Sequence, residues 1–131
     1  MKKVEVVAAI IKFGEEILCV QKPLHKFEYI AYKYEFPGGK IEEGESREQA
    51  LLREITEELN LKVSIRSFFT TITHSYPDFE LTMHSYVCNT DTKELTLNEH
   101  IAYQWLTAAD LAPLDWAAAD LPIVKKLMAT Q

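Results

Sequence analysis

The sequence has 131 residues, a net charge of −6 at pH 7 and two cysteines. This length suits one globular domain, so we interpret residues 1–131 as a single domain that is a monomer or a homodimer. The acidic balance and the lack of a basic stripe argue against nucleic-acid polymers as partners. With no signal peptide and no apolar span recognised, we expect a cytoplasmic protein without a membrane partner.

The N-terminal part of the chain is predicted to hold two strands and a long loop. Residues 4–13 and 17–20 are rich in Val, Ile and Ala, and residues 14–16 between them indicate a hairpin turn. Residues 23–35 are unusually aromatic for a loop, so we expect them to fold over the sheet or line a pocket. The two glycines of segment 36–40 are expected to allow a sharp turn and a close approach to a ligand.

Residues 46–59 are predicted to form one helix. Ser46 can cap its N-terminus, and Gln49 follows three residues later, as in a capping box. Helical periodicity puts an apolar stripe on one face and three carboxylates on the other. The apolar residues are Leu51, Leu52, Ile55 and Leu59, and the acidic ones are Glu54, Glu57 and Glu58.

The acidic face of this helix has two interpretations. Its carboxylates repel one another by a few tenths of a kcal/mol per pair, and Arg53 relieves only part of that repulsion. Oxygen ligands on one rigid face suit Mg²⁺, or Mn²⁺ as an alternative, and the lack of a nearby Cys or His pair argues against zinc. A solvated acidic surface is the other interpretation.

The rest of the chain is predicted to add strands and a closing helix. Residues 61–75 and 80–90 are β-rich and are joined by a turn at 76–79. A polar loop, a strand, a short turn or helix and a final helix follow at 96–100, 101–105, 108–111 and 120–129. This succession predicts an α/β protein, an α/β/α sandwich around a mixed β-sheet.

The acidic helix belongs to a longer spaced pattern. Gly39 is followed after five residues by Glu45, and after seven more by residues 53–61, Arg-Glu-Ile-Thr-Glu-Glu-Leu-Asn-Leu. This pattern resembles the Nudix box of the Nudix hydrolase family, and the only departure is Asn60, where the family has glycine. Asn tolerates the left-handed backbone needed after a helix. We expect the substitution to cost about 1 kcal/mol and to leave catalysis intact.

The resemblance implies a Nudix fold and a set of catalytic residues. Either Glu54 or Glu99 would accept a proton from water, and Arg53 would position a glutamate. Glu99 lies outside the box, at a spacing from Trp105 similar to that in MutT-like members; a merely solvated glutamate and the nearby Glu94 are the alternatives. The catalytic residues implied are Arg53, Glu54, Glu57, Glu58 and Glu99. The metal ligands implied are the Gly38 carbonyl, Glu54, Glu57, Glu58 and Glu99.

The Phe-Pro-Gly-Gly-Lys sequence at residues 36–40 is similar to that of MutT-like nucleotide hydrolases within the family. The residues that the resemblance implies in substrate binding are Lys22, Phe36, Gly39, Lys40, Tyr76 and Asp120. Three of these residues have alternatives to a role in binding. Lys22 could be a solvated lysine at a strand end, Tyr76 could serve simple packing, and Asp120 could cap the final helix.

The resemblance as a whole implies a Mg²⁺-dependent pyrophosphohydrolase. Its substrate would be a nucleoside or deoxynucleoside triphosphate, converted to the monophosphate and pyrophosphate. Sanitation of 8-oxo-dGTP and hydrolysis of CTP or modified dCTP are both allowed. Two alternatives stay open: another nucleoside diphosphate-linked substrate, such as ADP-ribose or a dinucleotide, and a non-catalytic nucleotide sensor.

Overall fold

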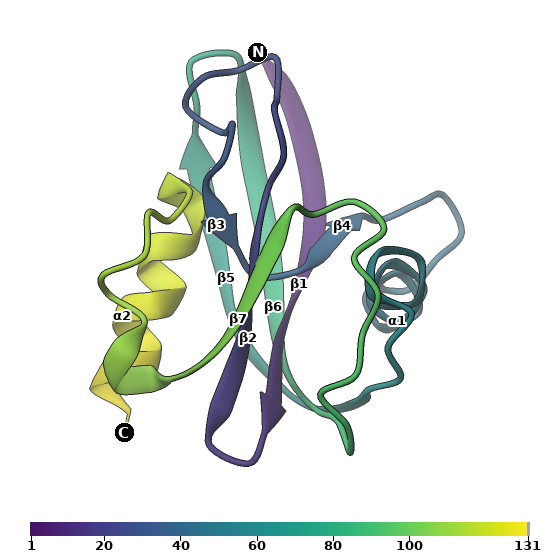
Figure 1. Ribbon diagram of the computed structural model, residues 1–131. Helices are drawn as coiled ribbons and strands as arrows, with labels where there is room; N and C mark the ends of the chain where they lie inside the picture. Colours follow the sequence, from purple (N-terminus) through teal and green to yellow (C-terminus); the bar gives the residue numbers. More distant parts are fainter. Residues whose placement is uncertain (131) are drawn as a thin grey trace.

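The computed structural model of the protein describes residues 1–130, in which one long helix and one shorter helix pack on opposite faces of a mixed sheet (Figure 1). The strands are β1 (Lys2–Phe13), β2 (Glu16–Gln21), β3 (Tyr34–Glu35), β4 (Gly38–Lys40), β5 (Ser64–Ser75), β6 (Phe79–Asn89) and β7 (Ala102–Thr107). The helices are α1 (Arg47–Leu59) and α2 (Leu121–Ala129), with short 3₁₀ turns at Ala108–Asp110 and Ala118–Asp120.

Strand β1 lies at the centre of the sheet. It pairs in parallel with β6 along residues 2–12, and β6 pairs antiparallel with β5. On its other edge, β1 pairs with β2 only near their shared turn. Strand β2 pairs with β7 along its whole length and with β3 at its far end. The segment from β3 to β4 therefore crosses from β2 to β1 where these two strands diverge. This crossing carries the glycines at positions 38 and 39 into the middle of the fold.

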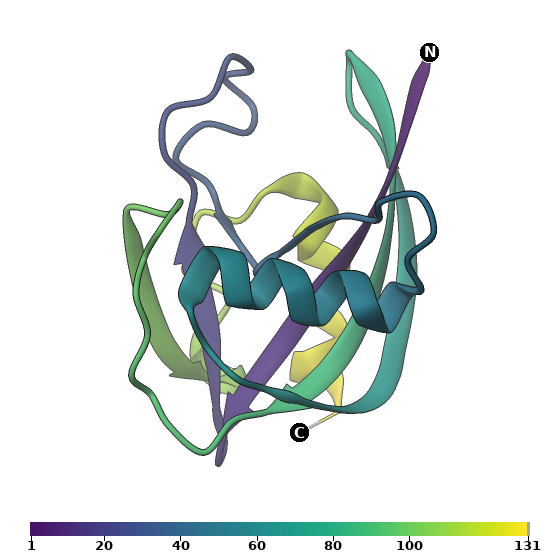
Figure 2. The ribbon, with the colours of Figure 1, turned by 90° about the vertical axis from the view of Figure 1, so that its right-hand side faces the viewer.

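The two faces of the sheet bury two separate apolar clusters. Along β1 the side chains alternate, so that Val7 packs on the α1 side while Ala8 packs on the α2 side. Helix α1 lies across one face of the sheet (Figure 2), where Leu51 and Ile55 pack into the cluster, and Ile123 of α2 packs into the cluster on the other face. The predicted α/β/α sandwich and mixed sheet are thus confirmed. Residues 7–11 are buried, and so are Cys19 and Cys88, which are both free thiols.

The capping expectations for α1 are also confirmed. Ser46 and Gln49 form a capping box, in which the Ser46 side chain accepts from the Gln49 backbone N–H at 3.1 Å and the Gln49 side chain accepts from the Ser46 N–H at 2.9 Å. Asn60 ends the helix in the left-handed region, with φ 49° and ψ 42°. The helix therefore begins and ends where its local sequence predicted.

Several element boundaries differ from the sequence expectation. Strand β5 begins at Ser64 instead of residue 61, because Leu61 packs into the cluster beneath α1. Segment 38–40 is a strand instead of a turn. Among the described residues, 1–130, no helix is long and apolar enough to cross a membrane.

Candidate active site

Arg53 holds together several acidic groups on the outer face of α1. Its Nε and Nη2 donate to the two carboxylate oxygens of Glu45 at 2.6 and 2.9 Å. Its Nη1 donates to Glu54 at 2.8 Å and to Glu57 at 3.2 Å, and Nη2 also donates to the Lys40 carbonyl at 3.0 Å. The hydrogen bonds from Arg53 lower the pKa of Glu45 to about 2. A planar guanidinium of this kind fixes the positions of the carboxylates that it binds.

Strand β4 passes so close to its neighbours that neither glycine has room for a side chain. A Cβ on Gly38 would lie 1.9 Å from the Val7 carbonyl oxygen, and one on Gly39 would lie 2.3 Å from the Glu54 carboxyl carbon. The sharp turn predicted here is wrong, since neither glycine has a positive φ and both are extended. Their small size instead lets the carboxylate of Glu54 pack directly on the backbone.

Glu58 is the buried member of the acidic face. Its side chain is only 3% exposed, and Oε1 has no hydrogen-bond partner. Burial first, and then a hydrogen bond with Glu54 and the charge of Glu35, raise the pKa of Glu58. The last turn of α1 carries no basic side chain, and a helix C-terminus is itself negative. This unpaired oxygen in a negative, oxygen-rich setting fits a hard divalent cation.

The carboxylates are not yet arranged as a complete metal site. Within residues 1–130, no three acidic, histidine or cysteine side chains are grouped closely enough to hold one ion together. In the present arrangement Glu54 and Glu57 both accept hydrogen bonds from Arg53. The predicted ligands therefore lie on one helix face, but coordination of an ion would require their side chains to reorient.

The loop before β7 docks against the C-terminal end of α1. The Asn98 backbone N–H donates to the Glu58 carbonyl at 3.0 Å, and the Asn98 amide donates to the Glu57 carbonyl at 2.8 Å. These bonds satisfy helix carbonyls that have no partner within the helix. They bring Glu99 close enough for its charge to raise the pKa of Glu58. Glu94, the alternative in the sequence, lies before the part of the loop that these bonds hold.

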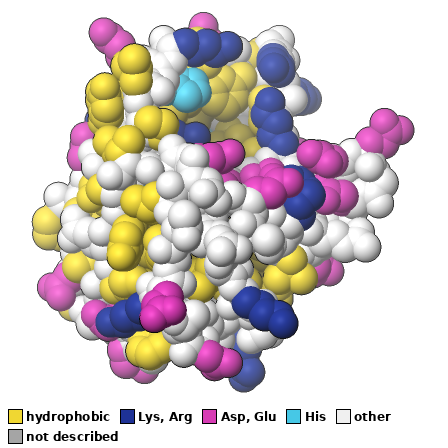
Figure 3. Space-filling view, turned by 45° about the vertical axis from the view of Figure 1, so that its right-hand side comes forward, with side chains coloured by type: hydrophobic (Ala, Val, Ile, Leu, Met, Phe, Trp, Pro, Cys, Tyr) yellow, Lys and Arg dark blue, Asp and Glu magenta, His cyan; other side chains and the backbone are white. Residues whose placement is uncertain are grey.

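A cavity of about 430 Å³ opens beside β4. The space-filling view shows a hollow with apolar side chains in its floor, basic side chains and a histidine around it, and acidic side chains along one edge (Figure 3). Among the lining residues are four lysines and His25. All six residues predicted to bind substrate line this one cavity: Lys22, Phe36, Gly39, Lys40, Tyr76 and Asp120.

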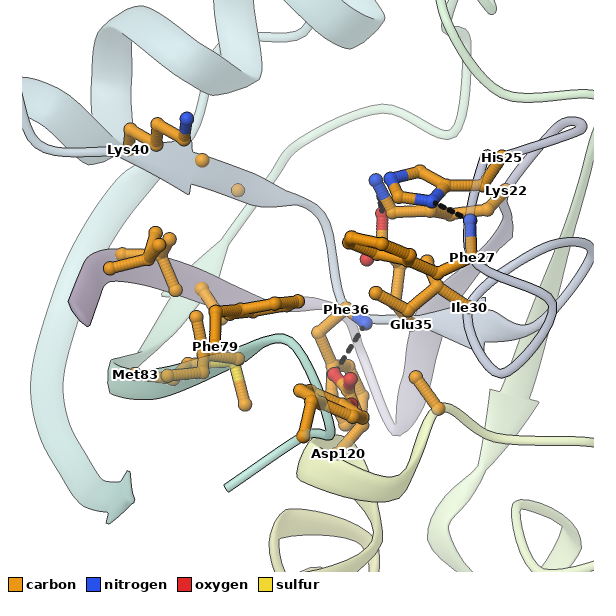
Figure 4. A pocket seen from close by; sticks show the side chains of 18 of the residues that line it. Lys22, His25, Phe27, Ile30, Glu35, Phe36, Lys40, Phe79, Met83 and Asp120 are labelled. Carbon is orange, nitrogen blue, oxygen red and sulfur yellow. Dashed lines mark hydrogen bonds and ion pairs between the residues drawn. The ribbon is translucent and has the colours of Figure 1, made fainter. Parts of the chain in front are cut away.

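Asp120 lines the cavity and lies beside Phe36, to which a dashed line joins its carboxylate (Figure 4). Its carboxylate makes no capping hydrogen bond to α2, so the predicted side-chain N-cap is wrong. The preceding 3₁₀ turn gives Asp120 a helical backbone, and its Oδ1 instead accepts from the Phe36 N–H at 3.1 Å. Burial, followed by the charge of Glu35, raises the pKa of Asp120 well above its usual range.

Tyr76 is buried in an aromatic cluster that forms one wall of the cavity. Its hydroxyl accepts from the Ala119 N–H at 3.0 Å, and its ring stacks on Tyr29 with centroids 5.2 Å apart. The Tyr29 hydroxyl donates to Asp78 at 2.6 Å and so ties the long loop to the turn between β5 and β6. The packing interpretation of Tyr76 therefore holds, and the same ring also faces the cavity.

Comparison with known proteins decides the family. The family model described as the NUDIX domain matches residues 1–127. The chain belongs to the Nudix family. A curated relative from Escherichia coli K12 named CTP pyrophosphohydrolase is 33% identical over 98% of this chain and 94% of its own length. An 8-oxo-dGTP diphosphatase from the same organism is 31% identical over 97% of this chain and 98% of its own.

A solved structure agrees with both sequence relatives. The solution structure of the DNA mismatch repair protein MutT, a Nudix hydrolase from methicillin-resistant Staphylococcus aureus 252, is 35% identical to this chain. The two superpose with a TM-score of 0.76, and the match covers 100% of each chain. The fold of this chain and its family therefore agree.

This Nudix protein also has site residues that sequence reasoning missed. Glu35 lines the cavity, lies 3.7 Å from the Lys22 ammonium, and accepts from His100 Nε2 at 2.9 Å. His100 in turn lies beside Glu58. Glu35 and His100 are 65 positions apart. Neither belongs to the spaced box pattern, and the only local hint was their position next to Phe36 and Glu99.

Proposed function

We propose that the protein is a MutT-like, Mg²⁺-dependent nucleoside triphosphate pyrophosphohydrolase, which converts a ribo- or deoxyribonucleoside triphosphate and water to the monophosphate and pyrophosphate. The observation that carries the proposal is the position of Gly39. It lines the cavity, while its backbone packs against the Glu54 carboxylate of the acidic helix. A nucleotide in the cavity would thus direct its phosphates past β4 towards the carboxylates.

The acidic side of the site would hold the metal. Glu54, Glu57, Glu58 and Glu99, with the Gly38 carbonyl, offer the hard oxygen ligands that Mg²⁺ or Mn²⁺ prefers. When bound, such an ion neutralises phosphate charge and lowers the pKa of an attacking water. Glu54 or Glu99 would accept the proton of that water, and the choice between them stays open. Arg53 keeps the Glu54 carboxylate oriented through the bond from Nη1.

The cavity side would bind the nucleotide. Lys22 and Lys40 are cationic lining residues suited to phosphate oxygens, and Phe36 and Tyr76 offer apolar and aromatic surface to a base. Burial raises the pKa of Asp120, and in its protonated form this carboxyl group can donate one hydrogen bond and accept another. A neutral carboxyl group can therefore read a base edge that mixes donors and acceptors, such as that of cytosine or of an oxidised guanine.

The test is pyrophosphate release with Mg²⁺ from the four dNTPs, the four NTPs, 8-oxo-dGTP, 5-methyl-dCTP, ADP-ribose and NADH. We expect a marked kcat/KM preference for one triphosphate. Asp120→Ala should reduce discrimination among bases more than it lowers kcat. Turnover of ADP-ribose or NADH alone would favour another diphosphate-linked substrate, and equal losses on every nucleotide in Asp120→Ala would remove base reading from this residue.

A non-catalytic sensor is the other class of function that this test addresses. Glu57→Gln should abolish most turnover while nucleotide binding persists, and Glu43→Gln, in the exposed loop before α1, is its control. If the wild type binds nucleotides but releases no pyrophosphate with Mg²⁺ or Mn²⁺, the sensor interpretation replaces the enzyme.

We further propose that the protein acts on free nucleotides in the cytoplasm, as a monomer or homodimer. The two buried free thiols, Cys19 and Cys88, support a reducing compartment. The net charge of −6 disfavours a nucleic-acid polymer as substrate.

A further inference from the structure

A chain of three side chains, of which His100 and Glu58 are buried, joins the cavity to the acidic helix. Glu35 lines the cavity, and its Oε2 accepts from His100 Nε2 at 2.9 Å. On the other side of the ring, His100 Nδ1 lies 3.9 Å from Glu58 Oε1. The side chains of His100 and Glu58 are each only 3% exposed. The imidazole is thus enclosed between a cavity residue and a box glutamate.

The contact between His100 and Glu58 is incomplete. Neither His100 Nδ1 nor Glu58 Oε1 has a hydrogen-bond partner, and 3.9 Å is too long for one between them. Unpaired buried polar atoms are costly and rare in native proteins. Here the two unpaired atoms face each other, and a hydrogen bond between them would satisfy both after a small rotation of the Glu58 side chain.

The His100 imidazole is held in a fixed position beside Glu58. Glu35 holds its Nε2, and the flanking backbone is fixed on both sides, by Asn98 N–H on the Glu58 carbonyl and by Ile101 N–H on the Gln21 carbonyl at 3.0 Å each. Glu58 Oε1 is the unpaired acceptor, so a rotation of this carboxylate would close the contact.

We propose that His100 is a positioning residue for Glu58, anchored by Glu35, and that its Nδ1 closes a hydrogen bond to Glu58 Oε1 when the other Glu58 oxygen binds a divalent cation. The inference rests on the proposed function, because it assigns a task within the same site. Lys22, 3.7 Å from Glu35, extends the chain to the part of the cavity where phosphate would bind. Occupation of the cavity and the orientation of Glu58 would then be linked.

Two substitutions at position 100 test the contributions of the two ring nitrogens separately. A glutamine amide can reach the place of Nε2 and keep the contact to Glu35, while it loses the group facing Glu58. An asparagine amide lies near the place of Nδ1 and keeps a polar group towards Glu58. We therefore expect His100→Gln to weaken Mn²⁺ binding about tenfold and lower kcat about 10- to 100-fold with little change in KM, and His100→Asn to recover part of both.

His84 supplies the matched control. It is also a buried histidine, but both of its nitrogens are satisfied, Nε2 by Glu5 and Nδ1 by Thr71, each at 2.8 Å. His84→Gln should affect the free energy of unfolding in a similar way and leave Mn²⁺ binding and kcat unchanged. Folding of each variant is checked by thermal unfolding before metal binding is measured.

Three measurements decide the proposal: Mn²⁺ binding without nucleotide by electron paramagnetic resonance, steady-state kinetics, and ¹⁵N-histidine NMR of the wild type before and after Mg²⁺. Two results together support the proposal. The NMR signal of His100 Nδ1 changes on addition of Mg²⁺ while the His84 signals do not, and Mn²⁺ affinity decreases in the order wild type, His100→Asn, His100→Gln. A folded His100→Gln that binds Mn²⁺ like the wild type overturns it, as does an unchanged Nδ1 signal, which needs no variant to fold. Absence of wild-type turnover would retract the proposed function, while the binding and NMR results would still decide the task of His100.

Discussion

The guanidinium of Arg53 donates two hydrogen bonds to the carboxylate of Glu45, from Nε to Oε2 at 2.6 Å and from Nη2 to Oε1 at 2.9 Å. Glu45 stands before α1 in the chain, so this pair ties the incoming loop to the helix face that carries the other acidic groups. The remaining nitrogen of Arg53, Nη1, donates to Glu54 and Glu57 and so orients both carboxylates.

Arg53→Lys should therefore lower kcat although the charge is kept. A lysine cannot bind two carboxylate oxygens and a third group in one plane, so Glu54 would lose its orientation. We expect a loss of about 10- to 100-fold, the usual effect of removing a partner that orients a ligand. Glu45→Gln should show a loss of the same kind in steady-state kinetics. Glu42→Gln is the control, because Glu42 is exposed and lies 3.7 Å from Nη1; an equal loss there would contradict the assignment to Glu45.

Gly39→Ala should impair activity more than stability. Its Cβ would meet the Glu54 carboxylate at 2.3 Å, and that flexible side chain can move away at the expense of its catalytic position. A displacement of about 1 Å can lower a rate by about 100-fold. Gly14→Ala is the reverse control: φ there is +60° with nothing within 4 Å, so it should cost about 1 kcal/mol of stability and leave kcat unchanged. Kinetics and urea unfolding of both variants check the contrast.

Asp120→Asn should become more stabilising as the pH rises. Burial raises the pKa of Asp120 well above its usual value of 3.8, so above pH 3.8 the unfolded chain releases a proton that the folded protein retains. The free energy of unfolding therefore falls with rising pH, up to the folded-state pKa, by a contribution that asparagine does not make. Urea unfolding of both proteins at pH 4.5, 6.0 and 7.5 measures the difference. A difference that is constant across these values would contradict the buried, neutral carboxyl group.

Asn60→Gly should stabilise the protein by up to about 1 kcal/mol, because glycine adopts the left-handed backbone at φ 49° without strain. Asn60→Ala should destabilise it by a similar amount. Because the Asn60 side chain is exposed, kcat should be unchanged in both variants. Thermal unfolding ranks the three proteins, and the order Gly, Asn, Ala is the expected result. A large change in kcat for Asn60→Gly would show that the departure from the box affects chemistry.

Much of this architecture was predictable because its signals are local. The capping box of Ser46 and Gln49, the left-handed Asn60 and the apolar stripe of α1 all depend on residues within one helix. The spaced pattern from Gly39 to Leu61 identified the acidic face for the same reason. The alternation of strands around two helices was enough to predict the sandwich.

Other features depended on contacts between distant parts of the chain. Gly38 and Gly39 were expected to turn, but Val7 and Glu54 require their small size in an extended strand. Asp120 was a good helix cap by sequence, yet the crossing segment offers it the Phe36 N–H. A local pattern contains neither neighbour.

The Glu35 and His100 pair shows the same division most clearly. The sequence predicts a loop at each of these residues, and 65 positions separate them. Only the docking of the loop before β7 on the end of α1 brings His100 between Glu35 and Glu58. Local chemistry thus defined the helix and its acidic residues, while burial and long-range packing determined which carboxylates are ionised, oriented or left without a partner.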